Sequence, residues 1–88
     1  MSKKKDFSNH DRFIELGLTI ALIRKARGLS QEQLALKARI SRSYLSAIEA
    51  PNIVRPFSVD VLFNVADALD IRPGDLLNTA ADILNTNH

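Results

Sequence analysis

Residues 30–49, SQEQLALKARISRSYLSAIE, predict two short helices joined by a tight turn. Ser30 can accept a hydrogen bond from the turn that follows it and Gln33 can return one, so a capping box begins the first helix. Ser41 caps the second helix, in which apolar side chains recur at intervals of three and four residues. Since only residues 39–41 separate the helices, we expect them to cross steeply, as in a helix-turn-helix.

This stretch resembles the helix-turn-helix of the Cro and phage-repressor family. Members carry a Leu-Ser-Gln-Glu-x-Leu-Ala run, here residues 29–35, and a later run that ends in Ser-x-Ile-Glu, here residues 41–49. The resemblance extends from about Phe13 to Leu77. It implies an all-α fold, a compact five-helix bundle of the phage-repressor DNA-binding-domain type, with its helix-turn-helix at about residues 30–50.

The function that the resemblance implies is transcriptional regulation through sequence-specific binding to double-stranded DNA. The expected protein is a repressor that binds a palindromic operator through the major groove as a homodimer. The alternative on the same fold is an antitoxin or protein-binding adaptor, whose protein partner is a toxin or an anti-repressor. Enzymatic activity is not expected, because both His lie near the ends of the chain and no carboxylate pair or Gly-rich phosphate loop is present.

The composition fits one small domain. Of 88 residues, 45% are apolar and 25% are charged, which is ordinary for a folded soluble protein. The absence of Cys excludes a disulfide framework, a thiolate zinc site and a thiol nucleophile. Charges interrupt the apolar runs before the roughly 20 residues that a membrane span needs. We therefore expect a cytoplasmic protein with no membrane contact, no cofactor and no metal.

The net charge of +2 conceals two halves of opposite sign. Residues 1–56 hold eleven Lys or Arg and five Asp or Glu, a net +6, whereas residues 57–88 hold one Arg and five Asp, a net −4. A basic half favours a polyanion partner, although a short chain reaches such an imbalance by chance about as readily. The cluster Lys3-Lys4-Lys5 predicts that residues 1–10 form a flexible basic arm, which either follows phosphates or remains a solvated tail.

Before the helix-turn-helix, the pattern predicts one long helix over about residues 11–27. Gly17 on this helix allows a neighbouring helix to approach closely, and Gly28 ends it. Its main apolar stripe comprises Phe13, Leu16, Ile20 and Ile23.

Two further helices are expected after the helix-turn-helix and a proline-containing loop. A helix over residues 58–69 should turn five side chains inward: Val59, Leu62, Phe63, Ala66 and Leu69. The last helix runs from about Pro73 to Leu84, and Leu76 and Leu77 should complete the core. Residues 11–85 are thus predicted to form a single domain, with residues 86–88 as a C-terminal tail.

In the docking mode of this family, the second helix of the pair lies in the major groove and its beginning touches base edges. The predicted base-reading residues point away from Leu45 and Ile48: Arg42, Ser43, Ser46 and Ala47. Arg42 can make a bidentate contact to guanine or, alternatively, contact a phosphate. The two serines can bond to bases or phosphate, and the Ala47 methyl can meet a thymine methyl.

Predicted contacts to the DNA backbone come from residues around this helix: Gln31, Arg39, Tyr44, Asn52, Arg55 and Ser58. Gln31 can offer its side chain and a free backbone N–H to a phosphate, or serve only at the helix start. Arg39 stands where the family favours Gly, so either it occupies a left-handed turn near DNA or the turn differs. Tyr44 can pack its ring while its hydroxyl reaches phosphate.

The resemblance also implies a structural salt bridge between Arg24 and Glu49, because family members often pair the residues at these positions. It would tie the first helix to the end of the reading helix.

A homodimer interface is expected on apolar side chains that one chain leaves uncovered. On the last helix these are Ala80, Ile83 and Leu84. On a second face of the first helix they are Ile14, Leu18 and Leu22, which either the last helix of the same chain or a second subunit would cover.

Overall fold

Five α-helices make up the computed structural model, which describes residues 10–86, with side chains from residue 11 to residue 82. They are α1 (His10–Ala26), α2 (Gln31–Ala38), α3 (Arg42–Glu49), α4 (Val59–Ala68) and α5 (Pro73–Thr86), and no strand occurs among these residues. The predicted all-α, five-helix fold is confirmed. The predicted basic arm falls almost wholly outside the described residues.

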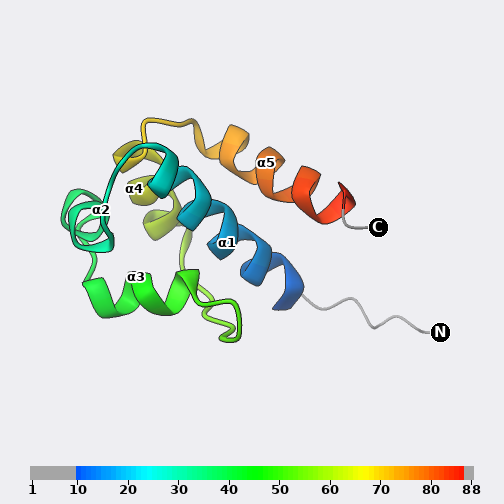
Figure 1. Ribbon diagram of the computed structural model, residues 1–88, viewed down its shortest axis with the longest axis horizontal. Coiled ribbons are helices and arrows are strands. Elements are labelled where there is room, and N and C mark those ends of the chain that lie inside the picture. Colours follow the sequence, from blue (N-terminus) through cyan, green and yellow to red (C-terminus); the bar gives the residue numbers. More distant parts are fainter. Residues whose placement is uncertain (1–9, 87–88) are drawn as a thin grey trace.

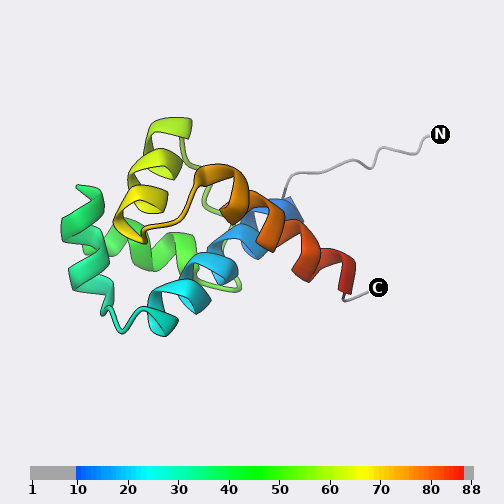
Figure 2. The same cartoon turned by 90° about the horizontal axis from the view of Figure 1, so that it is seen from above.

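The long helices α1 and α5 lie side by side, and the three shorter helices gather at one end of this pair (Figure 1). In Figure 1, α3 forms the lower edge of the helical bundle. Figure 2, which is seen from above, shows that α4 lies behind α1 in the view of Figure 1. One surface of α3 is therefore left without a helix across it. No helix within the described residues is long and apolar enough to cross a membrane.

Serine caps begin three of the five helices. The Ser30 hydroxyl accepts a hydrogen bond from the Gln33 N–H at 3.0 Å, and the Gln33 side chain accepts from the Ser30 N–H at 2.8 Å, which completes the predicted capping box. The Ser41 hydroxyl accepts from the Tyr44 N–H at 3.0 Å, and Ser58 caps α4 in the same way. Each cap contributes about 1 kcal/mol and sets the residue at which the helix begins.

One core joins all five helices. Its largest fully buried side chains come from every element: Ile20 and Thr19 of α1, Leu34 of α2, Leu45 of α3, Val65 and Leu69 at α4, and Leu76 of α5. The inward positions predicted for the second helix of the pair are confirmed, because Leu45 and Ile48 are buried, and Leu34, Ala35 and Ala38 of α2 are buried as well.

Three side chains predicted to be inward are instead on the surface. Val59 is 60% exposed, Phe63 47% and Leu77 45%. α4 packs through a stripe centred on Val65 and Leu69, and Val59 and Phe63 lie to one side of this stripe. On α5, Leu76 points into the core, and the next residue, Leu77, points about 100° away around the helix, toward solvent.

Ala80, predicted for a dimer interface, also requires correction. It lies one helical turn after Leu76 and is only 7% exposed, because it packs into the same core. Its small side chain is therefore used within the monomer.

Gly17 allows a close contact between α1 and α3. A Cβ atom built there would overlap the backbone carbonyl oxygen of Ile48 and lie 3.0 Å from its carbonyl carbon. The missing side chain thus lets α1 pass directly against the C-terminal turn of α3, as the sequence predicted.

The turn between α2 and α3 passes through a left-handed residue. Arg39 has φ 61° and ψ 39°, and its N–H donates to backbone carbonyls of the last turn of α2. Of the two alternatives that the sequence left open for this turn, the structure therefore has the left-handed one, with an arginine in place of the family's usual glycine. This conformation costs a residue with a side chain about 1–2 kcal/mol.

Replacing Arg39 with Gly should therefore raise the free energy of unfolding by about 1 kcal/mol, since part of the relief is offset by the greater freedom of Gly in the unfolded chain. Urea denaturation with an unchanged m-value would measure it. Lys37→Gly, in the last turn of α2 with ordinary helical geometry, is the matched control and should lose about 1 kcal/mol. A loss in both variants would contradict the prediction.

Candidate nucleic-acid interface

α3 has one anchored face and one free face. Leu45 and Ile48 are buried in the core, whereas Arg42, Ser43 and Ser46 are exposed and Ala47 is half-buried. Because the exposed residues occupy the first turns of the helix, its N-terminal part can meet a ligand without rearrangement of the core. The protein itself covers none of the three exposed side chains predicted to read bases.

The two helices of the motif cross steeply, as the sequence predicted. In Figure 1, α2 is seen nearly along its axis while α3 lies across the view. This crossing leaves the exposed face of α3 at the edge of the molecule, where a rod-like partner such as a DNA duplex can approach it.

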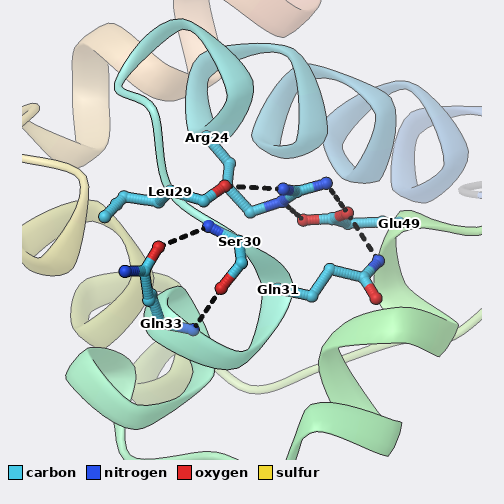
Figure 3. Close-up of polar contacts among 6 residues, drawn as sticks. All are labelled: Arg24, Leu29, Ser30, Gln31, Gln33 and Glu49. Atoms are coloured by element: carbon cyan, nitrogen blue, oxygen red, sulfur yellow. Dashed lines mark hydrogen bonds and ion pairs between the residues drawn. The ribbon is translucent and has the colours of Figure 1, made fainter.

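A buried polar network fixes the C-terminal end of α3 (Figure 3). Arg24 donates from Nε to Glu49 Oε2 at 2.8 Å and from Nη2 to Oε1 at 3.0 Å. Its Nη1 donates to the Leu29 carbonyl oxygen at 2.7 Å. The predicted salt bridge is therefore present and bidentate, with the two side chains only 10% and 4% exposed. It joins α1, the start of α2 and the end of α3.

Gln31 also belongs to this network. Its side-chain amide donates to Glu49 Oε1 at 2.9 Å (Figure 3), so the side chain is held within the protein rather than pointing toward a ligand. Its backbone N–H lies in the first turn of α2, where helical N–H groups have no partner within the helix. The residue type alone did not reveal the Glu49 bond, since an amide near a helix start can serve several partners.

The segment that follows α3 carries three further residues predicted to contact DNA. It forms a narrow loop that extends past the C-terminal end of α3 and then turns back toward α4 (Figure 1). Asn52, Arg55 and Ser58 are exposed on it. The Arg55 guanidinium carbon lies 4.9 Å from the centre of the Tyr44 ring, so this loop residue returns to α3. The Ser58 hydroxyl oxygen is occupied by its cap on α4.

Arg27 is a structural residue that the sequence interpretation missed. Its Nε donates to the Leu69 carbonyl oxygen at 2.8 Å and its Nη2 to the Asp70 carbonyl oxygen at 3.4 Å. Asp70 has φ 58°, a left-handed end to α4 that Asp tolerates better than most residues. No local sequence pattern could pair Arg27 with Leu69 and Asp70, because these residues are more than 40 positions apart. The one available signal was Asp70 itself, since Asp is common in the left-handed turn that ends a helix.

The fold and the free face of α3 define a DNA-binding protein built on a helix-turn-helix. The family model described as Helix-turn-helix matches residues 20–76, which is more than half of the chain. The chain belongs to this family, in its Cro and phage-repressor branch. No curated protein gives a significant match.

Solved structures agree with this assignment. The restriction-modification controller protein C.AhdI from Aeromonas hydrophila is 35% identical, with a TM-score of 0.69 over 74% of this chain and 96% of that chain. The clp gene regulator ClgR from C. glutamicum is 31% identical, with a TM-score of 0.69 over 77% and 86%. A mutant of the restriction-modification controller protein C.Esp1396I shares the fold, with 21% identity and a TM-score of 0.78 over 86% and 94%.

Family and fold together make this chain a DNA-binding transcriptional regulator.

Proposed function

We propose that the chain is a repressor that binds a palindromic operator as a homodimer and reads it with α3 in the major groove. The observation that carries the proposal is the division of α3 into a buried face, Leu45 and Ile48, and an exposed face that begins with Arg42. Arginine pairs bidentately with guanine and serine hydroxyls bond to several bases. Repression follows from occupancy, because a protein that covers an operator excludes other proteins from the same DNA.

Contacts to phosphates would position α3 without reading sequence. Arg39 at the turn and Asn52 and Arg55 in the loop after α3 are exposed on either side of the reading helix. The backbone N–H groups at Ser58 and at the start of α2 can add neutral donors. For Gln31 this contact is proposed for its backbone N–H, because its side chain is bound to Glu49.

Uncovered apolar side chains support a homodimer. Leu77 of α5 and Val59 and Phe63 of α4 are exposed, and Val59 and Leu77 border an apolar groove of about 580 Å³. On α1, the predicted interface residues Leu18 and Leu22 are exposed as well, and Ile14 is half-buried.

We assign the dimer contact to α5 with α4, because three large apolar side chains are exposed there and two of them border the apolar groove. The side chains of Ile83 and Leu84, also predicted for the interface, lie outside the described ones. Two α3 helices about 34 Å apart in such a dimer would match half-sites one helical turn apart.

Selection of bound sequences from a random DNA pool tests the proposed function. The expected product is an inverted repeat with half-sites one turn apart, bound by a species that sediments as a dimer. Binding that is equally weak on every sequence would contradict an operator-specific repressor. No binding to DNA, together with tight binding to a toxin protein, would establish the antitoxin alternative.

Arg42→Ala and Arg55→Ala should weaken operator binding in different ways. Loss of a bidentate base contact at Arg42 should cost about 1–3 kcal/mol and relax preference at one operator position. Loss of a phosphate contact at Arg55 should weaken all sequences about equally and lower the salt dependence by about one ion. Fluorescence anisotropy on matched and mismatched operators at several salt concentrations would measure both. A uniform loss from both variants would contradict the division between reading and positioning.

A further inference from the structure

Arg55 is an exposed cation held over an aromatic ring by the fold. Its guanidinium carbon lies 4.9 Å from the centroid of Tyr44, the single tyrosine of the chain. Among the side chains of residues 11–82 this ring is the only partner of Arg55, which forms no hydrogen bond or salt bridge with them. A cation within about 6 Å of a ring face is attracted by the ring quadrupole. The contact is therefore a specific one, between a helix and a loop.

The two residues differ in how firmly each is held. Tyr44 belongs to α3, is half-buried and packs against the core beside Leu45. Arg55 lies in the segment between α3 and α4, which has no helix of its own. The ring is thus the fixed partner and the guanidinium is the adjustable one. Arg55 has many rotamers in solution, and the ring favours those that bring its charge beside the reading helix.

We propose that Tyr44 is a positioning residue for Arg55, holding its guanidinium against α3 so that it meets a DNA phosphate in a set direction. In a cation–π contact the guanidinium is attracted to the face of the ring without donating a hydrogen bond, so its N–H groups remain free to bind a phosphate. The Arg55 side chain then loses conformational entropy when the protein folds and not when it binds DNA, so the affinity for DNA is higher. The inference rests on the proposed function, and it assigns Tyr44 a role through its ring, separate from any contact of its hydroxyl.

The fold-loss in operator affinity caused by Arg55→Ala, measured in three backgrounds, tests the coupling. In the wild-type and Tyr44→Phe backgrounds the loss should be the same, because both rings can hold Arg55. In the Tyr44→Leu background it should be about two- to fivefold smaller, the size expected for an exposed cation–π contact. Arg42→Ala, on the same helix, is the matched control, and its fold-loss should not depend on Tyr44.

The free protein provides a second measurement that needs no DNA. Protons of a side chain above an aromatic ring shift upfield, so the Arg55 δ-protons should resonate upfield of those of the exposed Arg42, and this difference should vanish in Tyr44→Leu. Equal positions for the two arginines in the wild-type protein would overturn the inference without any variant.

The outcomes separate this inference from the function on which it rests. Operator binding with an equal loss from Arg55→Ala in all three backgrounds would refute the positioning role alone. An equally reduced loss in Tyr44→Phe and Tyr44→Leu would assign the effect to the hydroxyl and also refute it. Upfield Arg55 protons in a protein that binds no DNA would refute the proposed function, and with it the role of the contact in binding.

Discussion

Arg24→Met should lower the free energy of unfolding by about 3–5 kcal/mol. It removes both hydrogen bonds from Arg24 to Glu49 and the bond to the Leu29 carbonyl oxygen. Glu49 is 7% exposed and, among the residues that the structure describes, would keep only the amide of Gln31 as a partner. Breaking one half of a buried ion pair is costly because the remaining charge stays away from water. Urea denaturation monitored by circular dichroism would measure the loss.

The matched control removes both charges. Arg24→Met combined with Glu49→Leu should recover much of the stability, because no buried charge is then left without its partner. Glu49→Gln alone should fall between these variants, since the amide can still bond to Arg24. If the loss in the double variant equalled the sum of the losses from Arg24→Met alone and Glu49→Leu alone, the two side chains would not act as a coupled pair.

DNA binding should also depend on the network that Arg24 forms with Glu49. It joins α1, the start of α2 and the end of α3, and so sets the direction in which α3 leaves the core. Arg24→Met should therefore weaken operator binding even at temperatures where the variant remains folded, although Arg24 itself is buried.

Gly17→Ala should lower the free energy of unfolding by about 1–2 kcal/mol. The added methyl group would overlap the backbone carbonyl oxygen of Ile48, and no rotamer change can relieve a clash between backbone and Cβ. Overpacking of this kind costs about 1–3 kcal/mol or more. The higher helix propensity of Ala returns only about 1 kcal/mol. Thermal and urea denaturation would both report the loss.

Gly74→Ala is the control for this prediction. Gly74 lies in the first turn of α5, has no atom within 4 Å of an added Cβ, and does not have a positive φ. The same chemical change should therefore leave stability unchanged or raise it by up to about 1 kcal/mol. Equal behaviour of the two variants would show that α1 can move away from α3 at little cost.

The sequence by itself determined where each helix begins and that two of them form a helix-turn-helix. Ser30, Ser41 and Ser58 act within the turn that follows them, so the chain carries these signals without tertiary contacts. The family resemblance added the Arg24–Glu49 bridge and the left-handed Arg39. The free face of α3 was predictable because the opposite face, with Leu45 and Ile48, had to be buried.

Only the tertiary structure decided which apolar residues of α4 and α5 are inside. Both helices are apolar around much of their circumference, and their rotation depends on the neighbours against which they pack. For this reason Phe63 and Leu77 are exposed while Ala80 is buried. The bond from Gln31 to Glu49 and the contact of Arg55 with Tyr44 join residues on different segments. Such pairs have no periodicity in the sequence, because they are set by the distances between packed segments.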